Sequence, residues 1–178
     1  MRCFVAVELP LPMREEIGRL QSRIATDGLR LVKPELVHIT IKFLGDVPQE
    51  KVGAVTEALG KVTFAPFPVR VSGMGAFPGR AVRVVWLGLA GNFQELYLNV
   101  EQALQPLGFA PDARGFSPHA TLGRVAHPDA EMNRQLGARI ANFADLDLGS
   151  FTVDRFYLKK STLTPEGPIY EDLAKFPL

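Results

Sequence analysis

The feature that most constrains this chain is a short phrase of residues that occurs twice. His38–Ile41 (HITI) and His119–Leu122 (HATL) both read His-x-Thr followed by an apolar residue. The chain has 3 histidines, and the two that open these phrases lie 81 positions apart. Similarity at a fixed offset indicates a duplicated structural unit. The repeat therefore predicts one active site that is assembled from two matched halves.

The match extends to the segments upstream of each histidine. Each half begins with an apolar, β-branched stretch that is typical of a strand, and a segment with apolar residues every three or four positions follows it. A glycine suited to a left-handed helix end comes next. The matched pairs are Cys3–Leu9 with Val84–Ala90, Pro12–Ile24 with Phe93–Leu104, and Gly28 with Gly108. Each half thus reads strand, helix, loop and His-x-Thr strand.

The remaining segments complete the predicted architecture. Helices are expected at Gln49–Lys61 and Asp129–Phe143, strands at Pro68–Gly73, Ser150–Lys159 and Ile169–Phe176, and a loop at Gly73–Gly79. The fold class is therefore α+β: bilobal with pseudo-two-fold symmetry, with two mainly antiparallel sheets flanking a central cleft and helices on the outer faces. We expect residues 1–178 to form a single domain of two intertwined lobes.

Composition narrows the class of protein further. Hydrophobic residues make up 47% of the chain, which is enough for a packed core, and the net charge is +1. A near-neutral chain is not suited to coating long nucleic acid, but its charge does not exclude a local pocket that binds one or two phosphates. Cys3 is the only cysteine, so an intrachain disulfide and a cysteine-rich zinc site are excluded. No apolar run is long enough to span a membrane, and we expect a cytoplasmic monomer with no membrane partner.

The chemistry of the repeated phrase follows from strand geometry. Residues i and i+2 of a strand point to the same face, so His38 projects with Thr40, and His119 with Thr121. A histidine titrates near pH 6.5, so one imidazole can donate a proton while the other accepts one. Displacement at phosphorus needs such groups on opposite sides, and the threonine hydroxyls can stabilise charge on the phosphate oxygens. The residues alone do not decide which histidine is the acid.

Three further residues are the main candidates for substrate binding, and two arginines are secondary ones. Arg124 lies five residues after His119 and could contact a phosphate. Phe4 and Phe43 lie on strands near the cleft and could stack on a base, although core packing is the commoner role of a strand phenylalanine. Arg80 and Arg83 could contact phosphate from beside the Gly73–Gly79 segment, which lacks the pattern of a nucleotide-binding loop.

Simpler explanations compete with this site. A lone strand histidine is usually a structural residue, and His127, which precedes a proline and lacks the threonine, fits a surface turn. A metal site would need more ligands than two histidines, and His-x-Thr is not a usual ligand spacing. We therefore expect no metal and no cofactor.

The quoted residues resemble a known family. The stretches His38–Gly45 and His119–Arg124 closely resemble the paired motifs of the two-histidine (2H) phosphoesterase superfamily. Arg2–Leu9, together with the segment from Gly75–Pro78 through Trp86–Leu89, looks like its RNA 2′,3′-cyclic phosphodiesterase branch, also described as 2′-5′ RNA ligases. The resemblance covers nearly the whole chain.

This resemblance implies a metal-independent enzyme that hydrolyses a terminal 2′,3′-cyclic phosphate on RNA to a 2′-phosphomonoester. It implies that His38 is the proton donor and His119 the proton acceptor, with Thr40, Thr121 and Arg124 on the phosphate. Three alternatives stay open: 2′-5′ ligation, a cyclic phosphodiesterase acting on a small nucleotide, and an RNA-end binder without catalysis.

Overall fold

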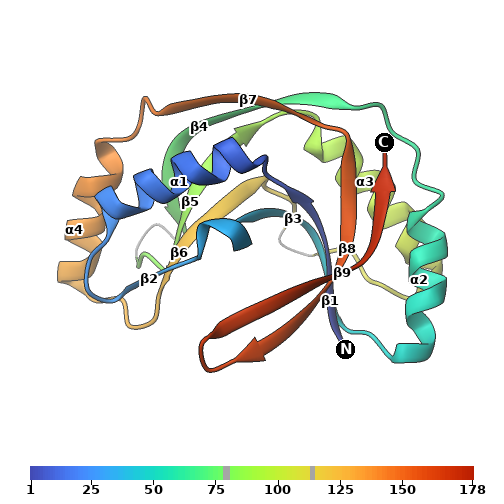
Figure 1. Ribbon diagram of the computed structural model, residues 1–178. Helices are drawn as coiled ribbons and strands as arrows, with labels where there is room; N and C mark the ends of the chain where they lie inside the picture. The colour runs from blue at the N-terminus through green and yellow to red at the C-terminus, as the bar shows by residue number, and fades with distance from the viewer. Residues whose placement is uncertain (78–80, 113–114) are drawn as a thin grey trace.

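The computed structural model describes residues 1–77, 81–112 and 115–178 (Figure 1). Its helices are α1 (Leu11–Ile24), α2 (Val52–Leu59), α3 (Phe93–Leu104) and α4 (Ala130–Ala141), with short 3-10 turns η1 (Pro34–Leu36), η2 (Gln49–Lys51) and η3 (Gln105–Leu107). Its strands are β1 (Arg2–Glu8), β2 (Leu29–Leu31), β3 (His38–Asp46), β4 (Phe67–Phe77), β5 (Val84–Ala90), β6 (His119–Val125), β7 (Asp147–Val153), β8 (Arg155–Thr164) and β9 (Gly167–Pro177).

All nine strands belong to one curved antiparallel sheet. Eight of them follow the order β7-β4-β5-β6-β3-β1-β8-β9, and β2 pairs separately with β6. The two strands that begin with the motif histidines, β3 and β6, meet at one residue pair, Ile39 opposite Ala120. The predicted bilobal α+β fold is confirmed, with the addition that this pair joins the two expected sheets into one.

Each half of the sheet contains strands from both halves of the sequence. After α2 the chain enters β4, which pairs with β5 and β7 in the second half of the sheet. After α4 it forms β7 and then crosses back, so that β8 pairs with β1 and β9 extends this edge. The segment Ser150–Lys159, expected as one strand, is therefore divided at Asp154, since its two parts pair with different neighbours.

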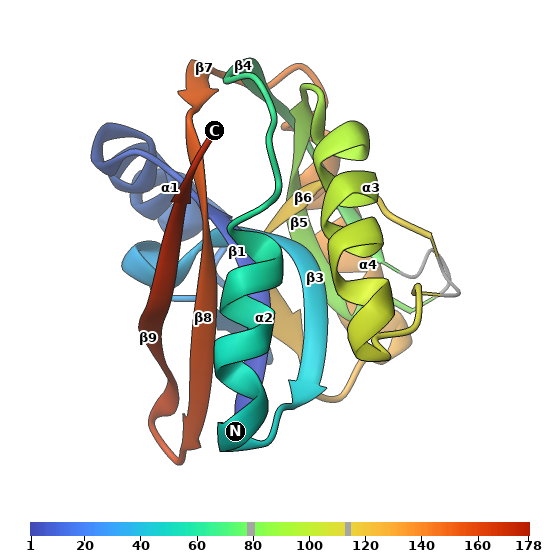
Figure 2. The same ribbon diagram turned by 90° about the vertical axis from the view of Figure 1, so that its right-hand side faces the viewer.

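The helices lie in two pairs at opposite ends of the sheet, α1 with α4 and α2 with α3 (Figures 1 and 2). Helix α1 buries Met13, Ile17, Leu20 and Ile24, the residues that its apolar spacing predicted. The glycines expected after α1 and α3 both have left-handed backbone angles, with φ of 84° at Gly28 and 83° at Gly108. The apolar spacing is thus confirmed, and Gly108 is the left-handed cap of η3, which follows α3. The expected left-handed cap of α1 is wrong, because α1 is capped by Ala25 and Gly28 lies in the turn that follows.

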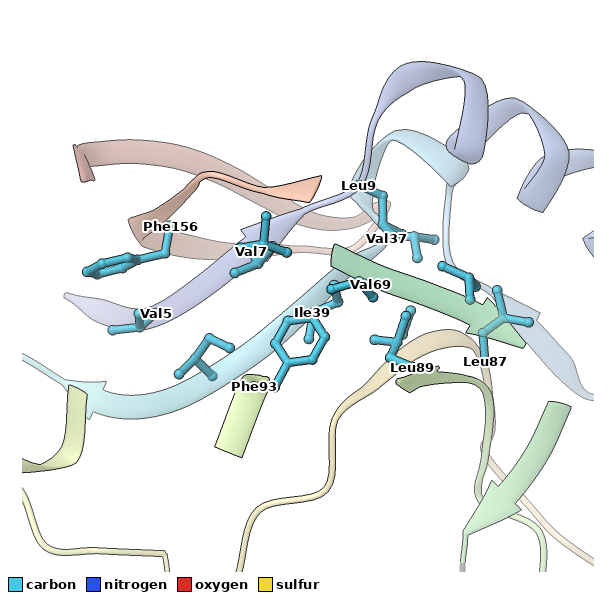
Figure 3. Packing of buried hydrophobic residues seen from close by; sticks show 14 of the residues in the cluster. Val5, Val7, Leu9, Val37, Ile39, Val69, Leu87, Leu89, Phe93 and Phe156 are labelled. Atoms are coloured by element: carbon cyan, nitrogen blue, oxygen red, sulfur yellow. The ribbon is translucent and has the colours of Figure 1, made fainter. Parts of the chain in front are cut away.

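The core is continuous across the junction of the two halves. Figure 3 shows Ile39 between Val5 and Val7 of β1, Leu87 of β5 and Phe93 of α3. All of these side chains are at most 1% exposed. The middle residue of the first His-x-Thr phrase is thus a packing residue, which fixes the strand that carries the polar pair on its other face.

The expected loop at Gly73–Gly79 is wrong over its first five residues. Strand β4 continues through Phe77 and pairs with β5, with a register shift between Val71 and Met74. Glycine in a strand pattern often marks such a bulge rather than a loop, and Gly73 occupies it here. Residues 78 and 79 lie outside the described residues. Within the described ranges, no helix is long and apolar enough to cross a membrane.

Candidate active site

A cavity of about 960 Å³ opens on the sheet beside the junction of β3 and β6. Its lining comes from β1, β2, β3, β6, the segment between β2 and β3, and the β8–β9 hairpin. Figure 1 shows this hairpin projecting beyond the other strands. Six of the seven main site residues that the sequence proposed line it: His38, Thr40, Thr121, Arg124, Phe4 and Phe43. The seventh, His119, lies two residues before Thr121 on β6.

The junction brings the two His-x-Thr phrases together. Because β3 and β6 are antiparallel and Ile39 faces Ala120, His38 lies beside Thr121 and Thr40 lies beside His119. Ile39 and Ala120 are fully buried, whereas both histidines and both threonines are partly exposed on the other face. The expected division between a packing face and a polar face is confirmed.

Both imidazole rings are held by the same backbone contact. Nδ1 of His38 lies 2.8 Å from the carbonyl oxygen of Leu36, and Nδ1 of His119 lies 2.7 Å from that of Ser117. In each case the carbonyl belongs to the residue two positions before the histidine. Because a carbonyl oxygen only accepts a hydrogen bond, Nδ1 carries the hydrogen in both rings. Nε2 of each neutral ring is therefore left without a hydrogen and is free of this backbone contact.

A matching bulge follows each phrase. The register of β3 against β1 shifts just after Thr40, and the register of β6 against β5 shifts just after Thr121. An extra residue reverses the alternation of a strand, so the fifth residue after each histidine faces the cavity. These residues are Phe43 and Arg124, which share the 81-residue offset of the histidines. The duplicated scaffold thus supplies an aromatic ring from one half and a cation from the other.

The same reversal turns Lys42 toward the helices. Its ammonium group donates to Glu101 of α3 at 2.6 Å and to the carbonyl oxygen of Ala110 at 2.8 Å. Lys42 is 5% exposed and Glu101 is 8% exposed. This buried pair anchors β3 to α3 behind the site.

Aromatic rings surround each histidine. Phe4 and Tyr170 lie with their ring centroids 5.0 Å and 5.2 Å from that of His38, and Tyr170 presents its edge to it. Phe77 lies 5.2 Å from His119, again edge to face. Phe4 is 3% exposed and supports His38, whereas Phe43 is 65% exposed. Among the described aromatic side chains that line the cavity, Phe43 is the most exposed, and its ring offers a face on which a base could stack.

The environment of His38 favours its neutral form. Burial lowers the pKa of His38 from 6.5 to about 4, and the positive charges of Lys159, Arg124 and Arg14 act in the same direction. The hydrogen bond to Leu36 opposes this change. His38 is therefore neutral near pH 7 in the absence of a ligand, and a bound anion would raise its pKa again.

Lys159 belongs to a charged group on the far side of His38. Its ammonium group binds the carboxylates of Glu8, at 2.6 Å, and Asp172, and its side chain is 7% exposed. His38 and Tyr170 line both the main cavity and a smaller one, of about 270 Å³, that holds this group. The two rings, together with Leu36, lie between the two cavities.

Sequence reasoning missed the contribution of the β8–β9 hairpin. Tyr170, Leu163 and Ile169 line the cavity, and the latter two are 66% and 54% exposed. Arg83 is exposed and is not in the lining, and Arg80 lies outside the described residues. His127 is exposed in a bend, as expected. Among the described residues, no group of three or more His, Cys, Asp or Glu could hold a metal ion.

The chain matches the family model for LigT-like phosphoesterases in two segments, residues 7–86 and 88–170. The starts of these segments lie 81 residues apart, which is the offset of the two histidines. The chain belongs to the LigT-like phosphoesterase family. Sequence relatives agree: it is 37% identical to the RNA 2′,3′-cyclic phosphodiesterase of Methanocaldococcus jannaschii over 99% of this chain and 100% of that protein. It is 38% identical to the enzyme of the same name from Archaeoglobus fulgidus, over 99% of each chain.

Solved structures have the same fold. The crystal structure of TT0787 from Thermus thermophilus matches with a TM-score of 0.84 and 28% identity, covering 100% of this chain and 98% of that one. The structure of E. coli LigT complexed with 3′-AMP matches with a TM-score of 0.79 and 25% identity, covering 99% and 97%. The resemblance inferred from the two motifs is therefore confirmed at the level of the family.

Proposed function

We propose that this protein hydrolyses a terminal 2′,3′-cyclic phosphate on RNA to a 2′-phosphomonoester. The single observation that carries the proposal is the pairing of the two His-x-Thr phrases at one junction, with both Nε2 atoms left for proton exchange. The names of the relatives from M. jannaschii and A. fulgidus support the choice of substrate. The 3′-AMP bound to E. coli LigT supports a cleft that accepts a nucleotide with a phosphate on its ribose.

In the proposed mechanism, one histidine serves each side of the phosphorus atom. Nε2 of His119 accepts a proton from water, whose oxygen forms a bond to phosphorus. The bond between phosphorus and the 3′ oxygen breaks, and protonated His38 donates its Nε2 hydrogen to that oxygen. The products are a free 3′-hydroxyl and a 2′-phosphate, and each histidine has exchanged one proton.

The donor role of His38 depends on the substrate. The ligand-free pKa of about 4 leaves this ring neutral near pH 7. The negative charge of the cyclic phosphate favours the protonated form, so that the donor becomes charged when its substrate is bound. The hydroxyls of Thr40 and Thr121 and the guanidinium of Arg124 bind the non-bridging oxygens and stabilise the charge that develops on them.

The same cleft supplies a site for the nucleoside. Phe43 stacks on the base, and Phe4 packs against the ring of His38. We further propose that residues 1–178 act as one catalytic unit, because both halves supply groups to the same step. We propose that the protein is a monomer in the cytoplasm, and that neither a metal nor a cofactor takes part.

The test is to identify the product. An oligonucleotide ending in a 2′,3′-cyclic phosphate is incubated with the protein in EDTA, and the product is analysed by mass spectrometry and by its sensitivity to phosphatase. The proposal predicts a 2′-phosphate at an undiminished rate, and no accumulation of 2′-5′-joined chains. Absence of turnover would refute it, and turnover that EDTA abolishes would refute the metal-free mechanism.

A further inference from the structure

Two arginines face each other directly across the rim of the cavity. Arg30 of β2 and Arg124 of β6 are partners in the antiparallel ladder, and both line the cavity. Directly opposed side chains in such a ladder have Cβ atoms about 4.5–5.5 Å apart, and like charges in that position are destabilising. Among the residues that the structure describes, no ion pair involves either arginine. An anion between or beside them would remove the repulsion.

The strand that carries Arg30 is held in place by dedicated contacts. The side-chain amide of Gln21, 4% exposed, donates to the carbonyl oxygens of Val32, at 2.6 Å, and Leu122, at 2.9 Å. Strand β2 also lies close against Gly123, where an added Cβ would come within 3.0 Å of the Leu29 side chain. A strand of only three residues is therefore fixed to β6, and Arg30 has a defined position beside the site.

Several basic side chains line the cavity besides Arg124. Arg124 is close enough to influence the pKa of both His38 and Tyr170, whereas Arg30 is not among the charges that act on either. Lys33 is three residues after Arg30, at most about 10 Å along the backbone, and it also lines the cavity. Four basic side chains line this cavity against one acidic side chain, Glu166, although the whole chain carries a net charge of only +1. The basic members are Arg2, Arg30, Lys33 and Arg124.

We propose that Arg30, with Lys33 beyond it, binds the phosphodiester on the 5′ side of the nucleotide whose cyclic phosphate is hydrolysed. This inference rests on the proposed function and specifies its substrate class. The cyclic phosphate carries one negative charge, which Arg124 and the two threonines accommodate. The phosphodiester on the 5′ side of this nucleotide carries a second negative charge, which Arg30 binds. The enzyme therefore selects the end of an RNA chain over a cyclic mononucleotide.

The experiment compares three substrates: uridine 2′,3′-cyclic phosphate, the dinucleotide UpU with a 2′,3′-cyclic phosphate, and the same dinucleotide with an uncharged methylphosphonate linkage. The wild-type protein should have a higher kcat/KM for the charged dinucleotide than for the other two. Arg30→Met, which keeps the apolar stem, should lower the kcat/KM for the charged dinucleotide on the order of tenfold to a hundredfold, as expected for one charge-assisted hydrogen bond. Lys33→Met should lower it less.

Two comparisons make the result specific. With the methylphosphonate substrate, Arg30→Met should cost much less than with the charged dinucleotide, because the charge that Arg30 binds is already absent. Arg19→Met removes an equally charged residue from the exposed face of α1, where it pairs with Glu16, and should leave the order of the three substrates unchanged.

The inference is overturned if Arg30→Met lowers kcat/KM equally for the charged and the uncharged dinucleotide. It is also overturned if the wild-type protein does not distinguish the three substrates. In both cases the proposed function stands. Failure of the wild-type protein to hydrolyse any of the three would overturn the proposed function itself, and the inference with it.

Discussion

The lowered pKa of His38 makes the stability of the folded protein depend on pH in a defined direction. In the unfolded chain this histidine titrates near 6.5, whereas in the folded protein its pKa is about 4. Between these values the unfolded chain binds a proton that the folded protein does not. The free energy of unfolding therefore falls as the pH falls from about 6.5 to about 4, and it is fully recovered above that range.

The size of this effect follows from the two pKa values. A change from 6.5 to about 4 corresponds to roughly 3 kcal/mol in the free energy of unfolding, most of which is lost by about pH 4.5. Replacing the histidine with a residue that does not titrate removes this contribution. His38→Gln should therefore lose less stability than the wild-type protein between pH 7 and pH 4.5, by about 2–3 kcal/mol.

Urea unfolding at both pH values measures this difference, with the fluorescence of Trp86, the single tryptophan, as the signal. The carboxylates that also titrate in this range are shared by both proteins and cancel in the comparison. His127→Gln, which removes an exposed histidine, controls for the substitution itself. If His38→Gln and the wild-type protein lose equal stability between the two pH values, folding does not lower the pKa of His38 and the reasoning is refuted.

Three other outcomes follow from the site and its support. Phe43 is 65% exposed, so Phe43→Ala should change the free energy of unfolding by about 0.5 kcal/mol or less and yet raise KM. Phe4 is 3% exposed, so Phe4→Ala should lower the free energy of unfolding by about 3–5 kcal/mol. Thermal unfolding and steady-state kinetics of both variants measure these effects. Lys42→Met should destabilise the protein by about 3–5 kcal/mol because Glu101 is left as an unpaired buried charge, and the double variant with Glu101→Leu should recover most of this loss in urea unfolding. In a cyclic phosphate substrate with sulfur in place of the 3′ oxygen, the leaving group needs no proton donor. His38→Ala should therefore hydrolyse this substrate much faster than His119→Ala in single-turnover assays. The opposite order would exchange the roles of the two histidines.

Much of the scaffold could be predicted from sequence because it is encoded locally or by the repeat. The apolar spacing of α1 and α3 is a property of neighbouring residues, and Gly108 has the left-handed angle expected where the second helical segment ends. The corresponding prediction for α1 is wrong, since this helix is capped by Ala25 and Gly28 lies in the turn that follows. The offset between His38 and His119 predicted two matched halves, and the fully buried Ile39 and Ala120 confirm which face of each strand is the packing face.

Features that depend on distant pairing were not predictable in the same way. The division of Ser150–Lys159 at Asp154 reflects pairing of β7 with β4 and of β8 with β1, which no local pattern reveals. Arg30 lies on a three-residue strand whose partner strand is more than ninety residues away in the chain. Tyr170 contacts the ring of His38 because the β8–β9 hairpin brings it beside β3.

One missed feature left a signal in the sequence. Strict alternation from His38 and Thr40 would turn Phe43 away from the cleft, and the same holds for Arg124 after His119. The two bulges reverse both, and the equal offsets of Phe43 and Arg124 from their histidines were available as a clue that they share a position.

The central claim is that His38 and His119 act together in one step on a cyclic phosphate. It is tested most directly by single-turnover rates for His38→Ala, His119→Ala and the double variant on an RNA end bearing a 2′,3′-cyclic phosphate. Groups that act as a unit have strongly non-additive effects. The account predicts that each single variant loses several orders of magnitude in rate and that the double variant loses little more than either. Losses that multiply in the double variant, or a single variant that retains the wild-type rate, would contradict it.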